Sequence, residues 1–342
     1  MAKKKTTNKK TTEKPASKSL NSNLHKARKT KQDEFYTQLP DIEEELRHYE
    51  KHFKGKTVLC SCDDPRVSNF FKYFTINFHR LKLKKLITTC YKNNDSTLFS
   101  TNEGERGVWL EYTGDHNGNK EVDAEEVGIH EFNGDGDFRS DEAIELLKQA
   151  DIVVTNPPFS LFREYIGQLM AYDKKFLIIG NHFAISYKGI FELIRDDKLW
   201  IGNSTPDAFR VPDHYEMVKN RSWRDDDGNN WRSLGNFCCW FTNLDIAKQY
   251  EDLLLSKTLT SMDYPTYDNY DAIEVSRVKN IPADYKGVMG VPITFLGKHN
   301  PKQFEIVGSN YIITQDPNGV YGRGSKLNGK RPLCVYLFVI ES

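Results

Sequence analysis

The residues Asn156-Pro157-Pro158-Phe159 bring together one amide side chain, two prolines and one aromatic ring. They directly follow residues 151–155, a short apolar and β-branched run that predicts a buried strand. Two consecutive prolines cannot continue a sheet ladder, so the strand must end and the chain must turn. Such a turn suits a planar exocyclic amine. The Asn156 Oδ1 atom and the Pro157 carbonyl can accept its two protons, while Phe159 stacks on the attached ring.

This pattern is typical of amino-group methyltransferases, whose motif is Asp/Asn/Ser-Pro-Pro-Tyr/Phe/Trp. A strand-to-helix turn with a doubled proline is the alternative interpretation of the four residues taken alone. The surrounding elements must place the turn at an edge where a substrate can reach it. The predicted helices cover residues 41–53, 67–78, 141–149, 161–172 and 187–196, and the predicted strands cover 57–61, 86–91, 152–155, 176–179, 199–201 and 237–242. This alternation predicts a parallel sheet covered on both faces, with binding sites at the carboxyl ends of its strands.

Three further segments could contribute to such a site. Cys62-Asp63-Asp64-Pro65 follows the first predicted strand, where a carboxylate can hold an ammonium group; an Asx turn that caps the next helix is the alternative. Gly136-Asp137-Phe138 follows the third sheet region, where an acid and an aromatic ring can bind an adenine. A calcium loop is disfavoured for residues 133–137, because the register lacks the alternating ligands and terminal glutamate of an EF-hand. The segment 33–38 precedes the first strand and could equally be a simple helix entry.

Together these segments resemble the EcoRI-type family of adenine-specific DNA methyltransferases, over most of the chain from about Leu24. The segments that carry the resemblance are residues 31–38, 63–74, 135–140, 151–165 and 287–296. Asp63-Asp64-Pro65 matches the family's unusual cofactor loop, which stands in place of a Gly-rich one. The resemblance implies an α/β fold: a Rossmann-like, S-adenosylmethionine-dependent methyltransferase sheet with helices on both faces. It also implies a smaller mixed region, partly inserted and partly C-terminal, that recognises DNA.

The same resemblance implies the roles of individual residues. The catalytic turn, which would hold the target adenine, is Asn156, Pro157, Pro158 and Phe159. The residues that would bind the cofactor S-adenosyl-L-methionine are Phe35, Tyr36, Asp63, Asp64, Asp137, Phe138 and Asn156. The expected reaction transfers a methyl group to adenine N6 and needs neither a metal nor a covalent cysteine. Because a stacked adenine cannot reach the turn, it must be flipped out of the duplex.

The charges are unevenly distributed along the chain. The 48 basic and 48 acidic residues balance overall, yet residues 1–32 hold eleven Lys and Arg and a single acid, Glu13. Few apolar residues accompany these charges, so residues 1–32 are predicted to form a disordered basic arm that meets a phosphate backbone. A solubilising or localisation tail is the alternative. The arm residues expected to contact DNA are Lys26, Arg28, Lys29 and Lys31.

Composition also suggests how the rest of the chain is divided. We expect a cofactor-binding and catalytic core at 33–202, an insertion at 203–235, a core return strand within 236–262 and a C-terminal recognition or accessory region at 263–342. Trp223, Arg224 and Arg232 of the insertion are candidate DNA contacts, although core packing explains its tryptophans equally well.

Other features narrow the class of protein. The six cysteines form no zinc-binding pattern, and no apolar run has the length of a membrane span or signal peptide. We therefore expect a cytoplasmic enzyme that acts on duplex DNA without a metal or a membrane. The rival functions are methylation of an RNA adenine or a protein glutamine, and a catalytically silent DNA-binding protein on the same fold. The recognised site, the oligomeric state (a monomer is one option) and the existence of a cognate restriction endonuclease stay open.

Overall fold

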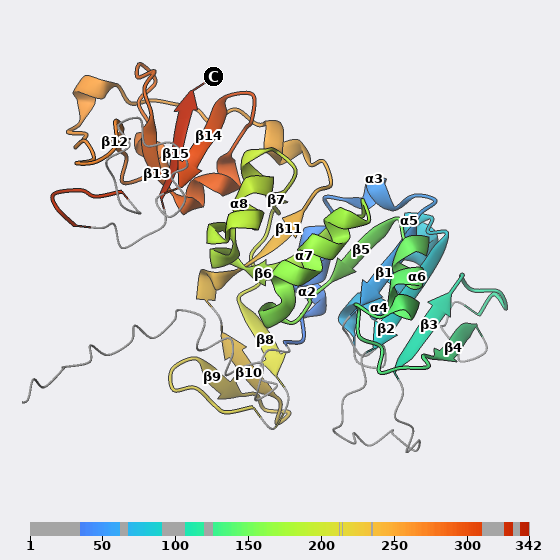
Figure 1. The fold of residues 1–342 in the computed structure, drawn as a ribbon. Helices are drawn as coiled ribbons and strands as arrows, with labels where there is room; N and C mark the ends of the chain where they lie inside the picture. The colour runs from blue at the N-terminus through green and yellow to red at the C-terminus, as the bar shows by residue number, and fades with distance from the viewer. Residues whose placement is uncertain are drawn as a thin grey trace, which may run out of the picture.

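The computed structural model describes residues 35–61, 68–90, 107–119, 126–211, 213, 215–233, 235–309, 325–330 and 336–341. Its centre is an eight-stranded sheet. The strands are β1 (Thr57–Ser61), β2 (Lys85–Cys90), β3 (Val108–Tyr112), β4 (Val127–Glu131), β5 (Ile152–Thr155), β6 (Lys175–Asn181), β7 (Trp200–Ile201) and β11 (Cys238–Thr242). Their order in the sheet is β4-β3-β2-β1-β5-β6-β11-β7 (Figure 1).

The sheet is mixed rather than wholly parallel. Strands β2, β1, β5 and β6 run parallel, as the alternation of strands and helices predicts. Strand β11 is antiparallel to both of its neighbours, β6 and β7. At the other edge, β3 and β4 pair antiparallel with each other, and β3 pairs antiparallel with β2. The fold is therefore mixed α/β, with its parallel strands at the centre.

Helices cover both faces of this sheet. The cluster of buried residues on one face includes α2 (Leu39–Leu46), α4 (Asn69–Ile76) and α5 (Phe78–Leu81), together with α3 (Glu50–Phe53). The cluster on the other face includes α6 (Asp141–Gln149), α7 (Phe162–Ala171) and α8 (Lys188–Arg195). Strand β1 contributes Leu59 to the second cluster and Val58 and Cys60 to the first. This burial on both sides explains why the strand sequence is continuously apolar.

Two smaller sheets complete the described structure. Residues 203–235 carry β8 (Ala208–Val211), β9 (Ser222–Arg224) and β10 (Asn230–Ser233), in the order β8-β10-β9. The C-terminal sheet contains β12 (Ile273–Glu274), β13 (Met289–Pro292), β14 (Phe304–Ser309) and β15 (Tyr336–Glu341), in the order β12-β13-β15-β14. Figure 1 shows this C-terminal sheet, in orange to red, beside α8 and apart from the β8-β10-β9 sheet. The short 3-10 helices are η1 (Phe159–Leu161), η2 (His182–Ser186), η3 (Gly235–Phe237), η4 (Ala247–Tyr250), η5 (Leu259–Ser261), η6 (Val278–Asn280) and η7 (Ile293–Lys298).

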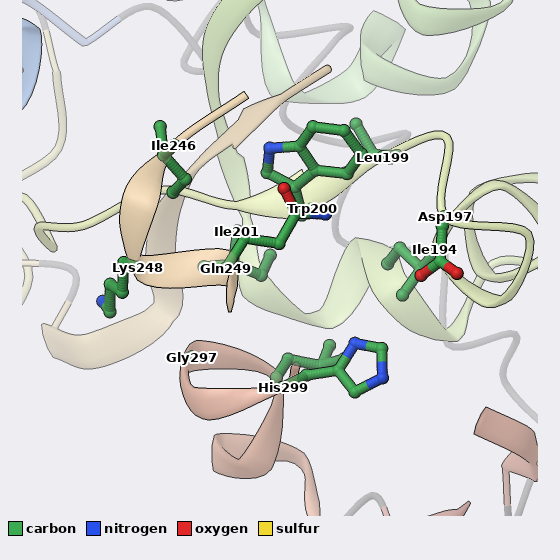
Figure 2. A pocket seen from close by; sticks show the side chains of 11 residues that line it. Ile194, Asp197, Leu199, Trp200, Ile201, Ile246, Lys248, Gln249, Gly297 and His299 are labelled. Atoms are coloured by element: carbon green, nitrogen blue, oxygen red, sulfur yellow. The ribbon is translucent and has the colours of Figure 1, made fainter. Parts of the chain in front are cut away.

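A small cavity lies where the C-terminal region meets the core (Figure 2). It is lined from one side by residues of α8, β7 and η4, and from the other by Gly297 and His299 near η7. Its volume of about 20 Å³ admits no more than a water molecule or so. Burial lowers the pKa of His299, whose Nε2 atom lies 2.8 Å from the Phe304 carbonyl oxygen. We therefore interpret this place as a packing contact between the two parts.

Candidate active site

The Asn156-Pro157-Pro158-Phe159 turn lies at the carboxyl end of β5, in the centre of the large sheet. Strand β5 ends at Thr155, as the two prolines predict. The Thr155 hydroxyl donates to the carbonyl oxygen of Ser61, the last residue of β1, and so ties the ends of the two strands together. The Leu161 N–H then donates to the Pro158 carbonyl at 2.9 Å and starts the short helix η1. Hydrogen bonds therefore hold the chain both before and after the turn.

The amide of Asn156 has a defined orientation. Its Nδ2 atom donates to the Phe35 carbonyl oxygen at 2.7 Å and to the Thr37 hydroxyl at 3.1 Å. A backbone carbonyl can only accept, so the nitrogen and not the oxygen of the amide must face Phe35. Oδ1 then points the other way and stays available to an incoming donor. Asn156 is only 7% exposed, so little of its side chain is open to solvent.

Thr37 is a residue that the sequence analysis did not single out. It is 3% exposed, and Asn69 holds its backbone carbonyl by donating from Nδ2 at 2.7 Å. The Thr37 hydroxyl shares the Asn156 Nδ2 group with the Phe35 carbonyl. Thr37 is therefore a positioning residue for the Asn156 amide. No sequence signal reveals this pair, because the two residues are far apart in the chain.

Replacing Thr37 by valine tests this role. Valine keeps the shape but removes the acceptor, so we expect turnover to fall by about two- to tenfold, the value of one hydrogen bond. The Thr37→Ser variant keeps the hydroxyl and should turn over close to the wild type. Steady-state kinetics at saturating cofactor and DNA would measure both variants. Equal turnover of the valine and serine variants would exclude the positioning role.

Phe35 contacts both the Asn156 turn and the segment at residues 203–235. Its ring centroid lies 5.3 Å from that of Phe159, 5.7 Å from that of Phe209 and 6.3 Å from that of Tyr215. The next residue, Tyr36, donates its N–H to the Arg210 carbonyl of β8 at 2.9 Å. The segment that contains Phe35 and Tyr36 therefore touches both the Asn156 turn and the β8-β10-β9 sheet.

The Asp137-Phe138 pair lies in the loop between β4 and α6. Gly136 has φ +78°, and a Cβ there would lie 2.9 Å from the Cys90 carbonyl oxygen at the end of β2. Only glycine allows this close approach. The Phe138 ring packs edge-on against Tyr165 at 5.1 Å, and the Tyr165 hydroxyl is hydrogen-bonded to the Ser61 hydroxyl. The pair therefore lies near the carboxyl ends of β1 and β2.

Arg139 forms a two-pronged ion pair with Asp137. Its Nε atom donates to Oδ1 at 2.8 Å and its Nη2 atom donates to Oδ2 at 2.6 Å. The hydrogen bond with Asp137 raises the pKa of Arg139 above its usual range. A third contact joins Arg139 Nη1 to Glu164 at 3.0 Å. Asp137 is thus oriented by an arginine that the sequence analysis did not connect with it.

The three DNA-binding candidates at residues 203–235 are Trp223, Arg224 and Arg232, and they differ in how accessible their side chains are to a ligand. Trp223 is 43% exposed and stacks on Trp231, with ring centroids 6.0 Å apart. Arg224 donates from Nε to Asn230 Oδ1 at 3.0 Å, and Arg232 donates from Nη2 to the Glu216 carbonyl at 2.9 Å. Both guanidinium groups are therefore already engaged within the insertion.

The strand register reveals one more candidate. Trp231 of β10 is paired with Trp223 of β9 on one side and with Arg210 of β8 on the other. Cross-strand partners share a face of the sheet, so these three residues form a row on one face, and Arg210 is exposed. Sequence reasoning missed Arg210 because its neighbours become known only from the register.

Several of the predicted residues lie outside the described part of the chain. They are the cofactor candidates Asp63 and Asp64 and the arm residues Lys26, Arg28, Lys29 and Lys31. Within the described ranges, no group of three or more His, Cys, Asp or Glu could hold a metal ion. No helix of the described residues is long and apolar enough to cross a membrane.

A mixed α/β sheet with an oriented Asn-Pro-Pro-Phe amide at the carboxyl end of a central strand defines a methyltransferase of amino groups. Comparison with known proteins gives the family. The chain belongs to the family described as adenine-specific methyltransferase EcoRI, whose model matches residues 23–329. The resemblance inferred from the sequence is therefore confirmed, and with it the class of enzyme.

Curated relatives agree with this assignment. The chain is 51% identical to the type II methyltransferase M.EcoRI of Escherichia coli over 314 residues, which cover 90% of this chain and 93% of the relative. It is 40% identical to the type II methyltransferase M.MgeORF184P of Mycoplasma genitalium, covering 83% of this chain and 85% of that protein. It is 38% identical to M.MpnI of Mycoplasma pneumoniae, covering 83% and 84%. No solved structure gives a significant match.

Proposed function

We propose that this enzyme transfers a methyl group from S-adenosylmethionine to N6 of a flipped adenine at a specific site in duplex DNA. The observation that carries the proposal is the Asn156 amide, whose nitrogen is held by Phe35 and Thr37 so that its oxygen is free to accept. In this role the enzyme would be the modification arm of a restriction-modification system, or a methylase without a cognate endonuclease.

The residues at the carboxyl edge fit such a cofactor. Phe138 lies next to the Asp137 carboxylate with the Arg139 guanidinium over its ring, 5.2 Å from the centroid, and Asp137 and Phe138 are both half-buried near the ends of β1 and β2. Asp137, Phe138 and Tyr36 would hold the cofactor, together with Asp63 and Asp64, which lie outside the described residues. When bound, S-adenosylmethionine supplies the methyl group on its sulfonium. We further propose that the large sheet is a Rossmann-like methyltransferase sheet, with residues 33–202 and 236–262 as the core.

The chain's own residues then act on the adenine. The N6 lone pair is conjugated with the ring, which makes N6 a poor nucleophile. When Asn156 Oδ1 and the Pro157 carbonyl accept its two protons, electron density shifts toward the nitrogen and its lone pair is aimed out of the ring plane. Phe159 stacks on the ring and replaces part of the stacking lost from the duplex. Positioning and electrostatics, rather than a strong base, provide the acceleration.

Target recognition is assigned to the insertion at 203–235. It is joined to the catalytic turn through the Phe35 ring and through the Tyr36–Arg210 hydrogen bond. The row Arg210-Trp231-Trp223 offers a cation beside stacked indoles, a combination that suits phosphate and base contacts. Trp223 and Arg210 are therefore stronger candidates for DNA contact than Arg224 and Arg232.

One experiment tests the proposed reaction. Unmethylated duplex DNA is incubated with the protein and S-adenosylmethionine, and its nucleosides are analysed by mass spectrometry beside an Asn156→Ala control. We expect N6-methyladenine from the wild type only. Cofactor binding without any methylated DNA base would favour RNA or protein as the substrate. Absence of cofactor binding would favour a silent DNA-binding protein.

Deleting residues 1–24 tests the basic arm, which lies outside the described residues. The deletion removes seven lysines, so the slope of log affinity against log salt should flatten by up to about six. Filter binding or fluorescence anisotropy at several salt concentrations would measure the slope. A shuffled arm of equal composition is the matched control and should restore the slope, because phosphate attraction does not require a sequence. An unchanged slope after deletion would support a solubility or localisation tail for residues 1–24, because Lys26, Arg28, Lys29 and Lys31 remain in the truncated protein.

A further inference from the structure

Two large aromatic side chains are exposed next to each other in the described structure. Phe183 is 47% exposed and Phe237 is 38% exposed, and their ring centroids are 5.4 Å apart. Single exposed apolar residues are common on protein surfaces. Two exposed aromatic rings in contact are different, because together they form one continuous apolar area that faces water. The pair is therefore a candidate surface for a partner.

The pair lies at the catalytic edge of the large sheet. Phe183 belongs to η2, which directly follows β6, and Phe237 belongs to η3, which directly precedes β11. The register Asn181↔Cys238 places the end of β6 opposite the start of β11. Strand β6 is the neighbour of β5, whose carboxyl end carries Asn156. Both rings thus emerge at the same edge as the catalytic turn.

The backbone around Phe183 is held firmly despite the exposure of its side chain. Its N–H donates to Asn181 Oδ1 at 2.8 Å, and its carbonyl accepts from the Ser186 hydroxyl at 2.7 Å. A ring on an ordered backbone loses little further freedom when a partner stacks on it. The Phe183 ring is therefore preorganised for stacking on a flat, apolar group.

Positive charge accompanies the rings. The exposed Arg221 side chain lies over the Phe237 ring, 5.7 Å from its centroid. The exposed Arg163 side chain of α7 lies over the ring of Tyr187, the residue that ends η2, at 5.0 Å. Aromatic faces flanked by guanidinium groups match a ligand that combines flat bases with phosphates, which is the chemistry of DNA.

We propose that Phe183 and Phe237 form an aromatic wedge that stacks on the DNA bases next to the position vacated by the target adenine, with Arg163 and Arg221 on the flanking phosphates. This inference rests on the proposed function and assigns one of its steps to named residues. Extruding a base breaks its stacking, and aromatic rings in its former neighbourhood offset that loss. The wedge would thus favour the flipped state without touching the methylated nitrogen.

The test compares two DNA substrates. One carries a paired target adenine and the other a target adenine opposite an abasic position, where little stacking or pairing opposes extrusion. For the double variant Phe183→Ala/Phe237→Ala we expect turnover on the paired duplex to fall by about ten- to a hundredfold. On the abasic duplex the loss should shrink to a small fraction of that. With 2-aminopurine at the target position, the fluorescence gain on binding should be lost in the double variant on the paired duplex.

Two controls keep the result specific. Tyr250→Ala removes another exposed aromatic ring, 46% exposed and contacted by Lys302, and should leave turnover unchanged. Phe183→Tyr and Phe237→Tyr keep a stacking face and should retain most of the activity. Equal losses on both duplexes, or wild-type turnover of the double variant, would overturn the wedge. A wild-type protein that methylates neither duplex would instead overturn the proposed function, so the two failures are distinguishable.

Discussion

Substituting Asn156 with alanine is expected to lower methylation turnover by about 10²- to 10³-fold, the effect of removing one electrostatic acceptor or donor from a preorganised site. The loss should fall mainly on turnover, and cofactor binding should be largely spared. Alanine removes Oδ1, which accepts from the target amine, and also Nδ2, which fixes the turn to Phe35 and Thr37. None of these contacts involves the side chains of Asp137, Phe138 or Tyr36, the described residues proposed to hold the cofactor, although Tyr36 lies between Phe35 and Thr37 in the chain.

Single-turnover kinetics with a saturating cofactor concentration would measure this effect, and calorimetry would measure cofactor affinity. Asn156→Asp is an informative companion variant. It keeps an acceptor for the amine, but its second oxygen would face the Phe35 carbonyl, which cannot donate. We therefore expect turnover between those of the wild type and the alanine variant. Wild-type turnover of Asn156→Ala would remove Asn156 from the mechanism.

The sequence predicts the local parts of this site well. The range of β5 and the end of the strand before the two prolines follow from β-branched residues and proline geometry alone. The ranges of β1 and α6 are also as predicted, because the strand is buried on both faces and Ser140 caps the helix by accepting from the Ala143 N–H at 3.2 Å. These features depend on residues close together in the chain.

The features that the sequence does not reveal depend on distant residues. The partner of the Asn156 amide comes from residues 35–37, and Arg210 joins the two tryptophans only through the register of β8 and β10. The mixed character of the sheet has the same origin. Strand β3 returns antiparallel beside β2, a pairing that periodicity within each strand does not encode.

The aromatic residues beyond Tyr264, in the C-terminal region, show how little composition alone reveals about which residues contact a ligand. Their number suggests a surface that reads DNA, but Phe295 and Phe304 are fully buried and pack edge-on, with ring centroids 5.2 Å apart. Tyr267 is 5% exposed. Composition alone does not distinguish a core aromatic from a contacting one. The insertion, which contacts Phe35 and Tyr36 and exposes Arg210 and Trp223, is thus the better candidate for recognition.

Glu45 attaches the insertion to the core, and its substitution should cost more stability than any other single polar change proposed above. The side chain is fully buried in α2. Its carboxylate accepts from the Asn203 N–H at 2.8 and 3.0 Å, and from both the N–H and the hydroxyl of Ser204 at 2.6 and 2.7 Å. The Tyr49 hydroxyl donates to it at 2.8 Å, and burial raises the pKa of Tyr49, so this donor stays protonated.

Glutamine at position 45 has the same shape but replaces one acceptor oxygen with a donor. Both carboxylate oxygens accept from the Asn203 N–H, so in either orientation the NH₂ group of glutamine would face that N–H in a fully buried site, and the charge that strengthens the other hydrogen bonds would be lost. We therefore expect the free energy of unfolding of Glu45→Gln to fall by about 2–4 kcal/mol. Urea denaturation would measure this. Glu44→Gln, at the exposed neighbouring position, is the matched control and should stay within about 0.5 kcal/mol of the wild type.

We expect the Glu45→Gln substitution to affect DNA binding more than cofactor binding. The residues that contact Glu45 open the segment leading to β8, whereas Asp137 and Phe138 lie in the loop after β4. Loosening that segment should raise the KM for DNA more than it lowers the cofactor affinity because, of the proposed cofactor residues that the structure describes, Tyr36 is the one hydrogen-bonded to β8. If Glu45→Gln were as stable as Glu44→Gln, the carboxylate would not be what holds residues 203–204. The position of the insertion would then depend on the aromatic contacts of Phe35 with Phe209 and Tyr215.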